Sequence, residues 1–173
     1  MNLIKVILVA AVILAIAGIF LPQEYSVSKV LVMPASVNEI YQRVENMDTW
    51  ERWTAWDEAV PPAGSSKANM ESGIGAGKYL SGSSGSGWFV ITNSSAIDGF
   101  EYVVYYDDGD KAIANVTFID LGGETKVTWT VEGKVTNPPV LAPYLAFIKG
   151  FLLKLSLRQN LENLKKSLTQ ADS

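Results

Sequence analysis

Apolar and polar residues follow several different spacings along this chain, and the first segment is apolar almost without interruption. Residues 3–21 contain one charged residue, Lys5, and Pro22 ends the run. As a helix rising about 1.5 Å per residue, the run would be about 28 Å long, close to the thickness of about 30 Å of a bilayer's hydrocarbon core. We therefore expect one transmembrane helix, and we divide the chain into an anchor, residues 1–22, and a soluble domain, residues 23–173.

A cleaved signal peptide is the alternative for this segment. Ala15 and Ala17 flank Ile16 in a small–x–small pattern of the kind that signal peptidases cleave. The apolar run continues past that point to Leu21, which favours an uncleaved signal anchor. Lys5 lies near the N-terminal end of the run, and the acidic residue Glu24 lies shortly after its C-terminal end. The positive-inside rule therefore places the domain on the extracytoplasmic, periplasmic side.

The soluble domain begins with a strand and two short helices. Residues 25–33 are rich in Val and Leu and read as a strand. Ser36 and Glu39 then form a capping box, which predicts the start of a short helix. A second helical turn carries three tryptophans at a spacing of three, which we expect to form the wall of a core or a pocket: Trp50, Trp53 and Trp56.

Four segments with strand character follow one another, joined by turns: residues 88–93, 100–107, 111–120 and 124–135. Strict alternation within them separates an inward face from an outward face. The inward face mixes aromatic side chains with alanines, as expected for a curved sheet that leaves a cavity. A densely filled core is the alternative interpretation of the same pattern.

A long helix, predicted over residues 138–169, ends the chain. Asn137 is its expected N-cap, and two prolines follow in the first-turn positions. Five leucines recur at helical spacing and form one apolar stripe: Leu153, Leu157, Leu161, Leu164 and Leu168. Toward the N-terminus the stripe passes over Ala146 and Gly150, so bulk is missing where we expect the helix to cross the mouth of the cavity.

Composition narrows the possible functions. The chain of 173 residues carries a net charge of −4, so no basic surface is available for nucleic acid. It contains no His and no Cys, which excludes imidazole-based and thiolate-based catalysis and Cys- or His-bound zinc. We expect neither a cofactor nor a bound metal, and the balance shifts from an enzyme toward a binding protein.

Several short motifs occur in the order found in one structural superfamily. They are Pro34-Ala35, Ile40-Tyr41, the three tryptophans, Gly73-Ile74-Gly75-Ala76-Gly77 before Tyr79-Leu80, the segment from Glu124 to Trp129, and the segment from Leu161 to Lys165. Over residues 25–168 the chain thereby resembles the START-like, or SRPBCC, superfamily of polyketide cyclase/dehydrase and lipid-transport proteins. Ala55 is a departure, since these proteins often carry Pro there.

The resemblance implies an α+β helix-grip fold, in which a curved antiparallel sheet wraps around the long C-terminal helix and leaves a deep apolar cavity. Members bind lipids, sterols, polyketides or other hydrophobic molecules, and some are enzymes. The superfamily has no shared catalytic residues to transfer to this chain.

We therefore expect a membrane-tethered domain that binds a hydrophobic or amphipathic, lipid-like molecule between the sheet and the C-terminal helix. The expected ligand-binding residues are Trp53, Trp56, Leu80, Trp88, Tyr102, Val104, Ala114, Val116, Trp129, Ala146, Phe147, Gly150 and Phe151. One alternative is an enzyme of the cyclase or hydrolase type, with Asp48, Asp57, Glu71 or Tyr102 as the reacting group. The other is a structural domain that contacts another envelope protein.

Overall fold

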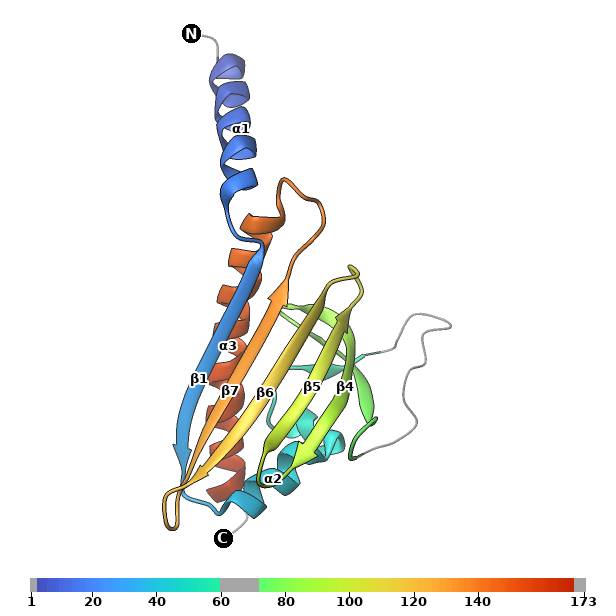
Figure 1. Cartoon of the computed structure of the whole chain (residues 1–173), viewed down its shortest axis with the longest axis vertical. Coiled ribbons are helices and arrows are strands. Elements are labelled where there is room, and N and C mark those ends of the chain that lie inside the picture. Colours follow the sequence, from blue (N-terminus) through green and yellow to red (C-terminus); the bar gives the residue numbers. More distant parts are fainter. Residues whose placement is uncertain (1–2, 60–71, 170–173) are drawn as a thin grey trace.

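The computed structural model describes residues 3–59 and 72–169. Helix α1 (Leu3–Phe20) projects from one end of the molecule (Figure 1). The remaining elements are β1 (Glu24–Met33), α2 (Val37–Glu45), the 3-10 helix η1 (Met47–Arg52), β2 (Asp57–Glu58), β3 (Gly77–Gly82), β4 (Gly85–Ser95), β5 (Gly99–Tyr106), β6 (Lys111–Asp120), β7 (Thr125–Lys134) and α3 (Ala142–Thr169).

All strands pair antiparallel in one sheet with the order β1-β7-β6-β5-β4-β3-β2. Strands β4 to β7 each pair with the preceding strand through a short turn, whereas β1 pairs with the last strand, β7. Helix α3 runs along the sheet, and α2 lies at the end of the molecule away from α1 (Figure 1). The expected α+β helix-grip architecture is confirmed.

The expected alternation is found in β6 and β7. Ala112, Ala114 and Val116 are buried while their neighbours are exposed, and Val127, Trp129 and Val131 are buried while their neighbours are at least partly exposed. The capping box of α2 also forms, because the side chains of Ser36 and Glu39 each bond the other's backbone N–H. Local sequence therefore specified these elements correctly.

The inward orientation expected for Trp88 is wrong. Register pairs Phe89 with Val104 and Trp88 with Tyr105, and residues opposite each other share a face of the sheet. Phe89 and Val104 belong to the core, so Trp88 lies half-buried on the outer face. There its ring contacts Tyr79 edge-on, with 5.8 Å between centroids.

Helix α3 begins later than expected. Its first residue is Ala142, and the N–H of Leu145 donates to the carbonyl of Leu141, so Asn137 is not the N-cap. The reason is the Pro138-Pro139 pair, since a residue before proline is disfavoured in the helical region. The leucine stripe is buried as predicted along its whole length: Leu153, Leu157, Leu161, Leu164 and Leu168.

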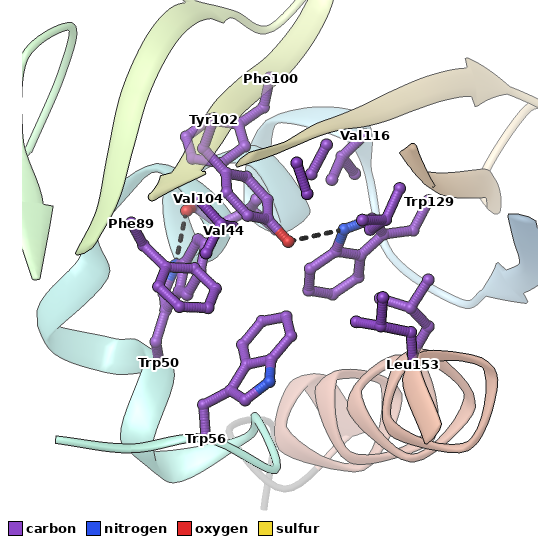
Figure 2. Packing of buried hydrophobic residues seen from close by; sticks show 14 of the residues in the cluster. Val44, Trp50, Trp56, Phe89, Phe100, Tyr102, Val104, Val116, Trp129 and Leu153 are labelled. Carbon is purple, nitrogen blue, oxygen red and sulfur yellow. Dashed lines mark hydrogen bonds between the residues drawn. The ribbon is translucent and has the colours of Figure 1, made fainter. Parts of the chain in front are cut away.

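A dense aromatic cluster occupies the space between the sheet and η1 (Figure 2). Trp50 lies at its centre, with ring centroids 5.2 Å from Tyr102, 5.7 Å from Trp53 and 6.0 Å from Trp56. Phe89, Phe100 and Trp129 complete the cluster, all at centroid distances from Trp50 below 6.5 Å. Since aromatic pairs at these separations are in contact, the three η1-region tryptophans fill the hollow side of the sheet.

Candidate functional site

Eight of the residues expected to bind a ligand lie together in this packed interior. All are at most 2% exposed: Trp53, Trp56, Leu80, Tyr102, Val104, Ala114, Val116 and Trp129. The sequence therefore identified which side chains converge on the hollow face of the sheet. In the structure these side chains contact one another, and their contact with a ligand stays a prediction.

The interior also holds a few polar atoms. The indole N–H of Trp129 donates to the Tyr102 hydroxyl at 3.1 Å, and that of Trp50 donates to the Val44 carbonyl at 2.9 Å. Asn160 of α3 accepts from the backbone N–H of Ala55 at 2.6 Å. Sequence analysis missed Asn160, because a single amide between stripe leucines resembles an outward-facing residue.

An apolar groove lies on the other side of α3, against the edge strand β1 and the end of α1. Its volume is about 780 Å³. Its lining is mostly hydrophobic and comes from Leu21, Pro22, Glu24, Tyr25, Ser26, Val27, Pro143, Tyr144, Ala146, Phe147, Ile148, Gly150, Phe151 and Lys154. We call it the β1–α3 groove. Its volume falls in the range of about 300–1,000 Å³ that is usual for small-molecule sites.

Small residues on α3 make this groove. At Gly150 an added Cβ atom would lie 3.4 Å from the Cβ of Tyr25, so the two backbones approach closely there. Ala146 is buried one turn earlier, while Phe147 and Phe151 flank the opening and are mostly exposed. At Gly150 the gap in side-chain bulk thus faces the edge strand β1, whereas the expected position was the mouth of a cavity in the interior.

These four α3 residues, Ala146, Phe147, Gly150 and Phe151, are the remaining members of the expected set apart from Trp88. The structure therefore divides the set between the aromatic interior and the β1–α3 groove. Tyr25 and Val27 of β1 complete the groove, and sequence analysis missed them. No sequence signal identifies them, because their place beside α3 depends on the pairing of β1 with β7.

A cluster of charges surrounds the buried side chain of Lys149, in the first half of α3. The Lys149 ammonium is 3.4 Å from Asp108 Oδ2 and 3.7 Å from Asp110 Oδ2, and it lies 3.6 Å from the centroid of the Tyr106 ring. Asp110 also accepts hydrogen bonds from the backbone and the hydroxyl of Thr136, at 3.0 and 2.9 Å. Two carboxylates thus neutralise one buried cation, and the cluster joins the β5–β6 turn to α3.

Burial raises the pKa values of several tyrosines in this part of the molecule. Loss of solvation raises the pKa of Tyr106 to about 12, and the nearby carboxylates of Asp108 and Asp110 act in the same direction. Loss of solvation also raises the pKa of Tyr25 and of Tyr102. These hydroxyls stay protonated at neutral pH, so they can donate hydrogen bonds but do not act as bases there.

We expect the folded state to lose stability as the pH rises from about 10 to about 12. The unfolded chain releases the Tyr106 proton near pH 10, whereas the folded chain retains it up to about pH 12, so the unfolded state is favoured across this window. For Tyr106 alone the loss amounts to about 3 kcal/mol. Denaturant unfolding at a series of alkaline pH values measures it. Tyr106→Phe keeps the ring under Lys149 and should reduce the loss of stability between about pH 10 and about pH 12. An unchanged pH dependence of stability in that variant would show that Tyr106 is not the titrating group.

The residues considered for catalysis are not brought together. Asp48 is bound to Lys78 at 2.7 Å on the surface, Asp57 is exposed on β2, and Tyr102 is buried against Trp129. Glu71 lies outside the described residues. Within residues 3–59 and 72–169, no group of three or more acidic side chains has a geometry that could hold a metal ion.

The sequence matches no protein-family profile, and no curated protein matches it significantly. Solved structures do match the fold. Protein MLL2253 from Mesorhizobium loti is 12% identical with a TM-score of 0.62, over 86% of this chain and 99% of that chain. The hypothetical protein jhp0584 from Helicobacter pylori is 10% identical with a TM-score of 0.60, over 82% of this chain and 86% of that chain.

Ara h 8.0201 is a third match, 9% identical with a TM-score of 0.57, over 85% of this chain and 99% of that chain. At such low identities the likeness concerns architecture and not activity. It agrees with the element order, the sheet topology and the long C-terminal helix described above. The chain therefore has the helix-grip fold of the START-like, or SRPBCC, proteins.

Proposed function

We propose that this protein is a membrane-tethered domain that binds one hydrophobic or amphipathic, lipid-like molecule, and that the β1–α3 groove is the binding site. The observation that carries the proposal is the groove itself, a mostly apolar channel of about 780 Å³ beside the end of α1. The helix-grip fold supports it, since that fold is suited to hydrophobic ligands. The aromatic rings already in contact make the interior the less favourable site.

The chemistry of the groove fits an amphipathic ligand. Aromatic and aliphatic side chains form most of its walls, and burying an apolar chain against them is favourable by about 25 cal/mol per Å². Glu24 and Lys154 are exposed at its rim, where they can interact with a polar or charged head group. A fatty acid, a lysolipid or a similar single-chain molecule has this distribution of polarity.

The tether in this proposal is α1, with residues 1–22 as the anchor. Among the described residues α1 is the one helix long and apolar enough to cross a membrane, with a mean hydropathy of 2.9. Nearly all of its residues are exposed to solvent, and a bilayer would remove this apolar surface from water. We place the domain on the extracytoplasmic side, as the charge distribution around the helix favours.

Gly150→Leu is expected to weaken the binding of a fluorescent fatty acid by at least about ten-fold, a loss of about 1.4 kcal/mol. The added side chain would extend from α3 toward Tyr25 and fill the groove. Helix propensity favours Leu over Gly, so the melting temperature should not fall. Fluorescence titration and a thermal melt of the full chain in detergent measure both quantities.

Gly150→Ala is the matched control for this experiment. Its Cβ atom meets Tyr25 at an ordinary contact distance of 3.4 Å and leaves most of the groove open, so binding should change little. Ala146→Leu should behave differently, because Ala146 is buried in the core, and overpacking there costs about 1–3 kcal/mol of stability. Unchanged binding in Gly150→Leu would exclude the groove as the site and favour the interior.

A further inference from the structure

The N-terminal half of α3 and the loop before it carry an unusual concentration of exposed apolar side chains. Six of them are between 38% and 78% exposed: Val140, Leu141, Leu145, Phe147, Ile148 and Phe151. We call this set the α3 tip surface. Between Lys134 and Lys154 the one charged residue is Lys149, and its side chain is buried against Asp108 and Asp110. A surface of this kind on a water-soluble face would be a binding or aggregation site.

The α3 tip surface lies directly beside α1. Gly18 is the buried residue of α1, and a Cβ atom there would lie 2.7 Å from the carbonyl oxygen of Val140. The hydroxyl of Tyr144 donates a hydrogen bond to the carbonyl of Leu14 at 2.8 Å. The last turns of α1 and the start of α3 are therefore packed together, at the end of the domain from which α1 projects (Figure 1).

These contacts set the depth of the domain relative to a bilayer. An 18-residue helix is about 27 Å long, slightly less than the hydrocarbon core, so α1 crosses it only if its whole length is used. Leu14 and Gly18 then lie below the surface of the hydrocarbon. The Tyr144 hydroxyl bonds the Leu14 carbonyl, about 9 Å before the end of α1, so this hydroxyl also lies below that surface and the start of α3 is held at the bilayer.

From this geometry we propose that the α3 tip surface is a second membrane contact, inserted into the interfacial region of the leaflet that α1 leaves. The occupant of this surface is lipid, because Val140 lies against Gly18 of α1 and no charged side chain is exposed between Lys134 and Lys154. The proposal rests on the tether in the proposed function. It adds that the domain is held against the bilayer, with the opening of the β1–α3 groove between Phe147 and Phe151 facing lipid.

The natural absence of cysteine allows a direct test. Single cysteines at Leu141, at Phe147, at Val9 in α1 and at Ile97 would each carry an environment-sensitive nitrobenzoxadiazole label in the full chain. Ile97 is an exposed apolar residue in the β4–β5 turn, at the end of the sheet away from α1, and serves as the control. The labelled proteins are reconstituted in phosphatidylcholine vesicles with or without nitroxide-bearing lipids.

We expect lipid-borne nitroxide to quench the labels at Val9, Leu141 and Phe147 at least about three-fold more than the label at Ile97, as insertion of about 5–10 Å requires. Quenching at Val9 without quenching at Leu141 and Phe147 would overturn the proposal and leave the tether standing. No quenching at Val9, Leu141 or Phe147 would overturn both. Labels at Leu141 and Phe147 that are shielded from an aqueous quencher but not quenched by lipid would identify a second copy or a partner protein, which also overturns the proposal.

Discussion

Trp50→Ala is expected to lower the free energy of unfolding by about 3–5 kcal/mol, the range for deleting a large aromatic side chain from a core. Trp50 is fully buried and contacts six aromatic rings, and its indole N–H is bonded to the Val44 carbonyl at 2.9 Å. Small domains have about 5–15 kcal/mol of stability in total, so this single change removes much of it. Denaturant unfolding of the full chain in detergent, followed by near-ultraviolet circular dichroism, measures the loss.

Two further variants show what the loss at Trp50 means. Trp50→Phe keeps a ring but removes the N–H donor, so it should lie between wild type and the alanine variant. Trp88→Ala removes a tryptophan from the outer face of the sheet and should cost less than half as much, since that side chain is only half-buried. A loss of stability below about 1 kcal/mol for Trp50→Ala would mean that the interior is loosely packed. The interior would then again be the favoured ligand-binding site.

Lys149→Met is expected to destabilise the domain by about 3 kcal/mol, because it leaves a buried carboxylate without its cation. The side chain of Asp110 is almost fully buried, and Lys149 is 3.7 Å from it. Methionine keeps the apolar stem and the packing against Tyr106, so the effect isolates the charge. Lys166→Met, an exposed substitution on the same helix, is the control and should change stability by less than about 0.5 kcal/mol.

The double variant Lys149→Met/Asp110→Asn tests the mechanism. Asparagine can still accept the two hydrogen bonds from Thr136 but carries no charge to bury. Part of the stability lost in the single variant should therefore return, and the coupling between the two sites is read from a double-mutant cycle. Additive losses from the two substitutions would show that Lys149 stabilises α3 through packing alone.

Local pattern determined most of the elements of this fold. The alternation in β6 and β7, the capping box at Ser36 and the buried leucine stripe of α3 are all properties of residues within a few positions of one another. Such signals survive in the sequence because pleat, helical turn and cap geometry repeat over short distances. The resemblance to the helix-grip proteins then supplied the order in which the elements pack.

Strand pairing and the two prolines before α3 decided the two details that the local pattern missed. Trp88 faces outward because Phe89 is the residue opposite Val104, and this pairing involves a second strand. Helix α3 begins at Ala142 because the two prolines before it hold the chain in another conformation. The outward orientation of Trp88 and the late start of α3 leave the spacing of apolar residues in their segments unchanged. That spacing alone therefore could not predict them.

The candidate site was predicted in part by the local pattern and in part depends on long-range strand pairing. The sequence by itself showed that Ala146 and Gly150 leave a gap in the bulk of α3, since small residues are visible in one helical row. Only the tertiary structure decided what faces that gap. Strand β1 pairs with β7, about a hundred residues away, which brings Tyr25 against Gly150, while Trp50 of η1 and the two tryptophans after it fill the interior. The gap becomes a groove at the edge of the sheet because long-range pairing, and not local spacing, determines which strand lies beside a helix.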